Sequence, residues 1–581
     1  MFVKVTRSGG RSYVKLVEAF RDDAGQPRQR VIATLGRLEQ VRAGAADALV
    51  NGLRRVSGDP SAVPPTPDPD AVRFSTALSV GDTWLLTALW HRLGFGDAFR
   101  RVLRNGRTSF DCERLLRVMV FNRLCDATSK LGVLRWLEMS RVPAVDTASV
   151  THQRLLRAMD TLAERADALQ HSLSVLLRPL IDQELSVVFY DLTTVGVEGA
   201  TELPGDVREY GMSKDGGIAR QFMLGVVQTD EGLPIAHRVW QGNTGEAVTL
   251  EPVIRDVLAH YPVKRVVLVA DRGLLSLDNL AQLQRITTDG KPDAAGQPLE
   301  FILAVPGRRY ADFAELLQPL HDAHCAQAAA EVTGETIWKI DGPHGKQSLR
   351  LVWAHDPDVA AEQGRRRKQA MDDLIAQAQA RAGKLDEQEE GKAFKGRKLS
   401  DSGAKAWLYR EVLEARLGAI IKVDLKGEPF TYSIDEYALQ RAQLNDGKLL
   451  LVTNVTDMPV PEVISRYKSL ADIERGFRVL KSDIEIAPVF HRLPDRIRAH
   501  ALICFLALVL HRVMRMQLKD ANSAYSPERA LEIARRIQFH QVALSGNASA
   551  SGLSEIDPVQ RQIFEALKLE LPTKDQIEAA L

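Results

Sequence analysis

The chain has 581 residues, of which 45% are hydrophobic and 26% charged, an ordinary globular composition with material for three or four domains. Its 76 Lys and Arg against 75 Asp and Glu leave a net charge of +1, so any surface that binds nucleic acid must be local. The N-terminus has no signal-peptide pattern, and the longest apolar run, 499–510, is too short to span a membrane.

The cysteines are widely spaced, which favours free buried thiols in a reducing cytoplasm over disulfides or a zinc site. They are Cys112, Cys125, Cys325 and Cys504. We therefore expect a cytoplasmic protein.

The N-terminal part predicts a small β-meander. Short alternating runs are separated by turn sequences such as Ser8-Gly9-Gly10, and we assign the meander with a short helix to residues 1–56. Prolines then crowd between positions 60 and 69, which predicts a Pro-rich linker over 57–73.

Apolar residues recur with helical spacing through a domain that we place at 74–182. Helices are expected over 82–93, around 115–120 and over 149–162, the first ended by Gly94. An arginine cluster lies between the first two helices, at Arg100, Arg101, Arg104 and Arg107. The sequence leaves two interpretations open: a solvated surface, or phosphate contacts of a helical DNA-binding domain.

The pattern changes to α/β at about residue 183. Strands are predicted at 185–190, 221–228, 234–240, 265–270 and 301–305, with helices at 246–260 and around Leu277, Leu280 and Leu283. Three strands joined by tight turns, followed by helix, strand, helix and strand, is the order of an RNase H-like fold. We therefore assign 183–305 to the first part of such a core.

Residues 306–455 predict a β-rich insertion. It holds β-like pieces at 337–340, 349–353, 420–423, 430–432 and 449–453, and a charged helix over 362–398 whose basic run is largely offset by acids. Gly342 to Lys346 lacks the full phosphate-loop spacing and predicts a hairpin turn. The core then resumes over 456–520 with a buried helix at 497–516, and a C-terminal helical region at 521–581 opens with Ser526-Pro527.

Three acids suggest the chemistry. Asp191 and Asp271 each end an apolar run that predicts a buried strand, where a charge has no packing role and costs desolvation. Glu474 lies in a helix predicted over 467–481, on which Tyr467, Glu474 and Lys481 step by seven and share one face. Singly, each acid could be a satisfied loop or surface group.

Taken together, these acids suit a site for divalent cations. Parallel strand ends gather at one edge of a sheet, and three carboxylates can bridge two Mg²⁺ ions, for which Mn²⁺ can substitute. One ion would activate water or a 3′-hydroxyl, and the other would stabilise the leaving oxygen. The expected metal ligands and catalytic residues are Asp191, Asp271 and Glu474.

At these residues the chain resembles the DDE-class transposases of bacterial insertion sequences, in the branch with a Tyr-x2-Arg-x3-Glu-x6-Lys motif and a β-rich insertion before the catalytic Glu. The resemblance covers roughly 75–570 and rests on three segments in order, namely Asp191-Leu-Thr193, Ala270-Asp271-Arg272-Gly273 and Tyr467…Glu474…Lys481. Between the two aspartates, Tyr210-Gly-Met-Ser-Lys214-Asp215 and Gly242-Asn243-Thr244 also resemble family landmarks. One position departs from the motif: Leu470 stands where the family has Arg.

The resemblance implies a DNA transposase that binds the terminal inverted repeats of its own element, cuts them and joins the freed 3′-hydroxyl to target DNA. It assigns metal binding to the three acids and DNA-backbone contacts to Tyr467 and Lys481. Arg478, Arg272 and Thr193 are expected to support DNA binding. The family further implies a homodimer on double-stranded DNA, at the bacterial nucleoid and away from membranes.

Two alternatives remain open. One is an RNase H-like nuclease that cuts DNA without joining it. The other is a non-catalytic DNA-binding protein derived from a transposase, an alternative that the departure from the motif at Leu470 keeps open.

Overall fold

The structure is a computed structural model, and it describes residues 1–59, 72–104, 109–181, 187–199, 203–213, 217–261, 267–270, 299–325, 331–342, 345–391, 398–544 and 549–579. Asp271, Arg272 and the helix expected around Leu280 lie outside these residues. The chain divides into two compact units, one of Met1–Ser75 with Gln541–Ala550 and one of Thr76–His540 with Ser551–Leu581.

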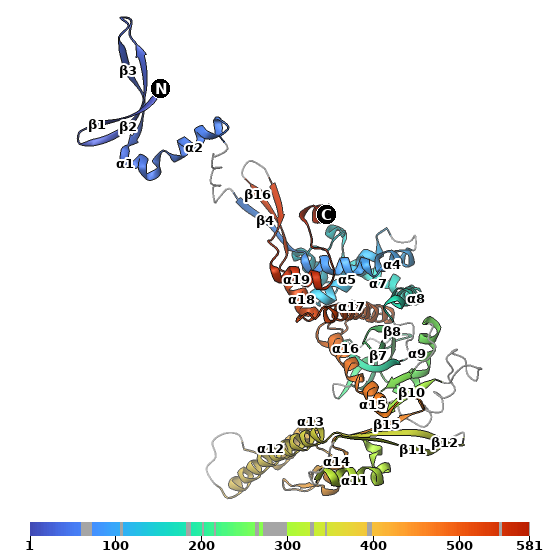
Figure 1. Cartoon of the computed structure of the whole chain (residues 1–581). Coiled ribbons are helices and arrows are strands. Elements are labelled where there is room, and N and C mark those ends of the chain that lie inside the picture. Colours follow the sequence, from blue (N-terminus) through green and yellow to red (C-terminus); the bar gives the residue numbers. More distant parts are fainter. Residues whose placement is uncertain are drawn as a thin grey trace. The chain divides into compact units, whose positions relative to one another are not determined.

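The predicted N-terminal meander is confirmed. Its strands are β1 (Phe2–Ser8), β2 (Arg11–Arg21) and β3 (Pro27–Arg37), paired antiparallel in that order (Figure 1). Gly9 and Gly10 have φ of 58° and 77°, as the tight turn between β1 and β2 requires. The following helices are α1 (Leu38–Gln40), the π-helical turn η1 (Val41–Ala45) and α2 (Asp47–Val56). Most of the predicted linker, 60–71, lies outside the described residues.

The helical part surrounds one long apolar helix, α17 (Pro494–Asp520). Around it are α3 (Gly81–Arg92), α4 (Phe95–Leu103), α5 (Cys112–Cys125), α6 (Gly132–Met139), α7 (His152–Glu164), α8 (Ala166–Leu177), α18 (Pro527–Ala534), α19 (Pro558–Ala566) and α20 (Lys574–Ala579), with 3₁₀ turns η3 (Thr147–Ser149) and η4 (Arg178–Leu180). The predicted helices of this region are confirmed, as is the cap of α18, where the Ser526 hydroxyl accepts from the Arg529 N–H.

Helix α17 is longer than predicted. Its 27 residues make it the one helix of the described chain with the length and composition to cross a membrane, yet 94% of its most apolar window is buried inside the protein. It contacts α5, α7 and β8. Its apolar surface is therefore covered by the chain's own helices and sheet. Cys112, Cys125 and Cys504 in this region are buried free thiols, as expected.

A mixed sheet forms the centre of the second unit. Its first strands are β5 (Val187–Gly196), β6 (Glu209–Met212), β7 (Ile218–Thr229), β8 (Pro234–Gln241), β9 (Val267–Ala270) and β10 (Glu300–Ala304), with helix α9 (Glu246–His260) between β8 and β9. The spatial order is β8-β7-β5-β9-β10, in which β8, β7 and β5 are antiparallel and β5, β9 and β10 parallel. All five predicted strands are present, although β5 continues beyond its predicted end at Tyr190 to Gly196.

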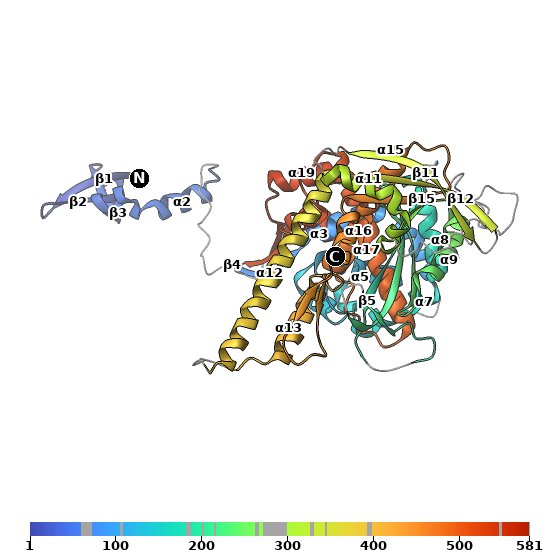
Figure 2. The ribbon, with the colours of Figure 1, turned by 90° about the horizontal axis from the view of Figure 1, so that it is seen from below.

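The strands of the predicted insertion extend this same sheet. β15 (Lys448–Thr453) pairs with β10, β12 (Gly345–His355) with β15, and β11 (Val332–Gly342) with β12. The other elements of this part are η6 (Gly307–Phe313), α11 (Ala314–Cys325), α12 (Pro357–Glu389), α13 (Asp401–Glu414), β13 (Ile421–Val423), β14 (Tyr432–Ile434) and α14 (Glu436–Asn445). Helices α12 and α13 lie side by side (Figures 1 and 2), and Gly342 pairs with Gly345 in the expected hairpin.

Three arginines of the basic run of α12 form ion pairs with acidic side chains. Arg365 and Arg366 pair with Glu362, and Arg367 pairs with Asp446. These three arginines are therefore already paired within the protein. The remaining elements are α15 (Val460–Lys468), α16 (Leu470–Ser482) and a small sheet of order β17-β16-β4, with β4 at Val72–Ser79, β16 at Gln538–Leu544 and β17 at Ser549–Leu553.

Candidate active site

The two strands expected to carry the aspartates are parallel neighbours. Their register runs from Val187 beside Val267 to Tyr190 beside Ala270. Asp191 follows Tyr190 directly, and Asp271 follows Ala270 in the sequence. The structure therefore places Asp191 directly after Tyr190, the last residue of β5 whose parallel partner on β9 is described.

Asp191 does not end its strand, contrary to the prediction. β5 continues to Gly196 because its antiparallel pairing with β7 goes on past Asp191, which lies opposite Val226. The carboxylate thus projects from a residue that is held in the sheet by β7 rather than from a loop.

The face of β5 that carries Asp191 is the face covered by α15 and α16. Side chains alternate along a strand, so Phe189, Asp191 and Val195 share a face. Phe189 packs in the same cluster as Leu470, and Val195 in the same cluster as Phe477. Helix α16 also contacts β5 directly (Figure 2). Asp191 therefore lies on the side of the sheet where the predicted glutamate helix packs.

A glycine fixes the strand next to Asp191. The ring of Tyr190 is fully buried, and its hydroxyl donates to the Thr249 Oγ1 at 2.9 Å. A Cβ at Gly225 on β7 would lie 2.7 Å from the Tyr190 Oη. Only glycine leaves room for this ring, and the ring in turn locates the backbone of Asp191, whose Oδ1 accepts from the Leu192 N–H at 2.7 Å. None of these supporting residues was predicted from the sequence.

Thr193 lies in β5 beyond Asp191 and is only 3% exposed. Such burial does not suit the DNA contact expected of it. It lies on the same face of the strand as Asp191. It is therefore placed to support the strand beside that carboxylate.

The predicted helix over 467–481 is two helices. α15 ends at Lys468 and α16 begins at Leu470, with Ser469 between them. The Ser469 hydroxyl donates to the Ser465 carbonyl at 3.0 Å, a local side-chain bond that competes with regular helix geometry. Tyr467 therefore sits in the last turn of α15, whereas Glu474 and Lys481 belong to α16, so the expected single row is divided.

Leu470, which stands where the family motif has arginine, packs in the hydrophobic core. Leu470 is 5% exposed and belongs to the cluster that includes Phe189 and Val463. An arginine head group there would be buried among apolar side chains. The substitution is therefore a gain of core contacts, and phosphate binding must come from other residues.

Two of the nearby cations are already paired. Arg466 pairs with Asp230 at 3.2 Å and with Glu462 at 3.4 Å. Lys468 lies 3.9 Å from Glu331. Arg478 on α16 is exposed and Lys481 half-buried, so α16 presents cations beyond the position of Glu474. The side chains of Glu474 and Arg475 are outside the described part of the structure.

Helix α16 approaches the sheet closely at a second glycine. A Cβ at Gly476 would lie 2.8 Å from the Nε2 of Gln228, a fully buried residue of β7. Glu474 stands two residues before this contact, four after Leu470 and three before Phe477. The backbone at Glu474 is thus held between two buried contacts, a feature that the sequence pattern did not reveal.

Two motifs that resemble family landmarks meet in space. The Gln221 amide donates to the Gly242 carbonyl at 3.0 Å and to the Met212 carbonyl at 3.2 Å. A Cβ at Gly211 would lie 2.4 Å from the Gly242 oxygen. Both glycines are required by this close approach. Lys214 and Asp215 lie outside the described residues.

The donor chemistry of the site fits hard divalent cations. Asp191 is a half-buried carboxylate on a rigid strand, and the residues expected beside it, Asp271 and Glu474, are also carboxylates. Oxygen donors of this kind suit Mg²⁺ or Mn²⁺ better than softer metals.

A separate group joins the end of α16 to α17 and α18. Asp483, His511 and Glu528 have ligand atoms within 4.8 Å of one another. The His511 imidazole pairs with the Glu528 carboxylate. Burial opposes ionisation of Glu528, but the hydrogen bond to His511 outweighs it and lowers the pKa of this carboxyl to about 2.

Comparison with known proteins defines the class. The family model described as transposase DDE domain matches residues 182–510, more than half of the chain, and the chain therefore belongs to the DDE transposase family. The N-terminal domain of IS1634 family transposases matches residues 2–65. The protein is thus a DNA transposase, an enzyme that cuts and joins DNA with divalent metal ions.

One solved structure among the matches is the Drosophila P element transposase strand transfer complex. It shares 10% identity and a TM-score of 0.22, over 85% of this chain and 96% of that one. No curated protein matches the chain significantly.

Proposed function

We propose that this transposase acts on the terminal inverted repeats of its own insertion sequence, and that Asp191, Asp271 and Glu474 hold two Mg²⁺ ions at its active site. The observation that carries this proposal is the register of β5 and β9. Tyr190 pairs with Ala270, and Asp191 and Asp271 are the residues that follow these two in the sequence. The carboxyl-terminal side of neighbouring parallel strands is where α/β proteins build their sites.

The strand order supports an RNase H-like core. The order β8-β7-β5-β9-β10, antiparallel and then parallel, is that of three sequential strands followed by two crossover strands. In this interpretation β11, β12 and β15 belong to an insertion between β10 and α15. Helical spacing predicts that Glu474 shares a face of α16 with Leu470 and Phe477, both of which are buried against the sheet region.

Some residues of the proposed site would position the metal ligands, and others would bind the DNA phosphates. Asp191 is fixed by β7 and by the Tyr190 ring, so its carboxylate would bind without rearrangement. Tyr467 at the end of α15, and Lys481 and Arg478 on α16, would hold DNA phosphates on either side of the scissile bond. The divalent ions, when bound, supply an activated water or 3′-hydroxyl and stabilise the leaving oxygen.

A cleavage and joining assay on DNA that carries the element's own ends tests the proposal. We expect Mg²⁺-dependent cutting and strand transfer by the wild type, and a loss of at least about 10³-fold in both for Asp191→Asn and Glu474→Ala. Glu436→Ala, on the exposed start of α14, is the matched control and should keep full activity.

Other outcomes of this assay identify the alternatives. Cutting without joining by the wild type would assign the chain to the nucleases. Unchanged activity of Glu474→Ala would refute the proposed ligand. Two ends captured by two copies of the chain, measured as the mass of the complex, would support the homodimer that we propose on double-stranded DNA in the bacterial cytoplasm.

A further inference from the structure

A cavity rich in cations lies beside the segment that joins α16 to α17. Its volume is about 470 Å³, and it lies between the end of α5, the start of α7 and this connecting segment. Four Lys and Arg side chains line it, whereas Glu485 is the one acid among the lining residues. The cations are Arg123, Lys130, Arg492 and Arg496. Like charges gathered at a cavity repel one another unless an anion joins them.

Lys130 is the cation that most needs a counter-ion. It is 5% exposed, and within the described chain its ammonium group forms no hydrogen bond or ion pair with an acid. Burial, followed by the charge of Arg123, lowers the pKa of Lys130 to about 7. A buried ammonium without a partner is costly, so the fold keeps this group at the cavity against its own stability.

Two of the other cations are held by the protein itself. Arg496 makes a bidentate pair with Asp160 at 2.6 and 2.8 Å. Arg123 donates to the carbonyls of Ile484 and Glu485 at 3.4 and 3.2 Å. These bonds make the wall of the cavity rigid, and the carbonyl partners leave the guanidinium charge of Arg123 uncompensated.

The helices around the cavity add to its positive potential. His152, the first residue of α7, and Leu493, the N-cap of α17, both line it. Helix N-termini carry a partial positive charge and offer free N–H groups to anions. At the rim, the Phe490 side chain is 68% exposed, and an exposed aromatic ring beside a phosphate site is a stacking surface for a base.

We propose that this cavity binds a phosphate group of the DNA backbone, with Lys130 as its central cation and Phe490 in contact with the adjoining nucleoside. The inference rests on the proposed function for the source of the phosphate. The connecting segment follows directly from α16, so a strand held here would be tied to the helix that carries Glu474. The site would add a DNA contact distinct from Tyr467 and Lys481.

The experiment measures DNA affinity without divalent metal, so that it is independent of cleavage. We expect Lys130→Met to weaken binding of the element's end about 10-fold and to reduce the slope of log affinity against log salt by about 1. Lys130→Arg should retain the wild-type slope. Lys519→Met, on the exposed last turn of α17, is the control and should bind like the wild type.

Phe490→Ala distinguishes DNA from free phosphate. It should weaken DNA binding several-fold while calorimetric binding of inorganic phosphate stays unchanged. Loss of phosphate binding in Lys130→Met with wild-type DNA affinity would show a free-anion site and overturn the proposal. Wild-type affinity and slope in Lys130→Met would overturn it as well, even if cleavage is intact and the proposed function stands.

A measurement on the unmodified chain covers the case in which Lys130→Met fails to fold. Reductive methylation followed by mass spectrometry should label Lys130 in the free protein, and end DNA should protect it at least several-fold. Equal labelling with and without DNA would refute the assignment.

Discussion

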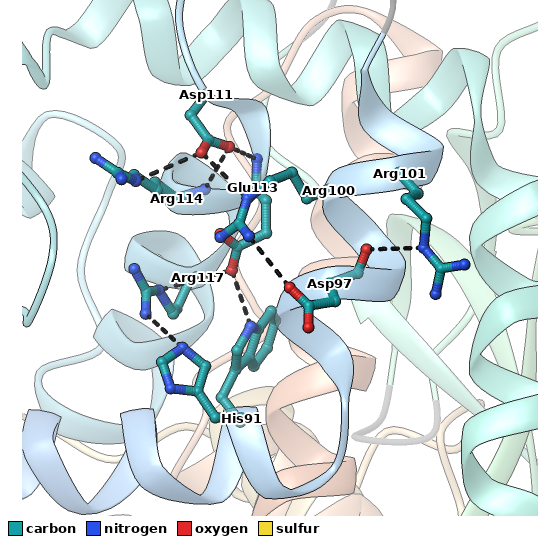
Figure 3. A network of polar contacts seen from close by, with 9 residues as sticks. His91, Asp97, Arg100, Arg101, Asp111, Glu113, Arg114 and Arg117 are labelled. Carbon is teal, nitrogen blue, oxygen red and sulfur yellow. Dashed lines mark hydrogen bonds and ion pairs between the residues drawn. The ribbon is translucent and has the colours of Figure 1, made fainter.

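Replacing Glu113 by glutamine tests what the arginine cluster of the helical region is for. In Figure 3 the Glu113 carboxylate lies among Arg100, Arg117 and the neighbouring acids. It is 3.1 Å from Arg100 and 3.7 Å from Arg117, and the Trp90 indole N–H donates to it at 2.9 Å. Its side chain is 0% exposed and that of Arg117 is 2% exposed. Arg100 is therefore part of a structural network, an outcome that neither of the two interpretations of this cluster gave.

The expected magnitude follows from this burial. Removing one member of a buried ion pair leaves the other charge uncompensated and costs about 3–5 kcal/mol. The glutamine oxygen can still accept from Trp90, so we expect a loss of no more than about 3 kcal/mol, the lower end of this range. Burial raises the pKa of Glu113 despite both arginines, so the fold favours a neutral group at this position and the loss is reduced further. The double variant Glu113→Gln/Arg117→Met should therefore recover most of the loss.

The assay is urea unfolding followed by tryptophan fluorescence and circular dichroism. Arg101→Ala is the control, because Arg101 is exposed and bonds only to the Asp97 carbonyl, at 3.3 Å, among the described residues; its change should stay within about 0.5 kcal/mol. A double variant that is less stable than Glu113→Gln would refute the reasoning, since the pair would then be stabilising in itself.

Three further predictions concern packing and charge. Gly225→Ala should cost about 1–3 kcal/mol in urea unfolding and lower cleavage activity, because the new Cβ meets the Tyr190 ring; unchanged activity would contradict the role given to that ring. Leu470→Arg, which restores the family motif, should lower the thermal midpoint, because Leu470 is buried; tighter DNA binding at unchanged midpoint would be the contrary result. Glu528→Gln should cost about 1–2 kcal/mol at pH 7, since the 41% exposure of the side chain weakens the pair with His511. The lowered pKa of Glu528 stabilises the fold above its ordinary value of 4.5, and this contribution is lost as pH falls toward about 2. The difference between the urea midpoints of wild type and variant should shrink in that window, and a constant difference would argue against it.

The sequence predicted those elements whose pattern is local. The strand runs of β5, β7 and β10 contain consecutive apolar residues, such as Phe301 to Ala304 of β10, and α17 repeats apolar residues over many turns. In each case the residues that decide the structure are neighbours in the chain. This is why the succession of strands and helices along the chain could be predicted.

The rest depends on contacts between distant residues. The apolar residues Val463, Leu470 and Phe477 step by seven across Ser469, so nothing in the pattern marks the end of α15 there. Nothing in the sequence shows that Gly225 and Gly476 must be glycine. The requirement comes from the side chains of Tyr190 and Gln228, which lie against the place where a Cβ would be. For the site itself, the sequence supplied the residue types and order, and the structure adds the β5–β9 register and the face on which α16 packs.

The way in which β15 completes the sheet has a consequence for synthesis. Residues 301–304 of β10 are fully buried, yet the strand beside them begins only at Lys448, roughly 140 residues later. At a translation rate of about 5–20 residues per second, β15 is synthesised roughly 7–30 s after β10, and the edge of β10 has no strand to pair with during that time. Throughout that interval the nascent chain presents an unpaired apolar edge, the feature most prone to aggregation. Expression of this protein should therefore depend on chaperones that cover the emerging chain, and a slower ribosome should lower its soluble yield.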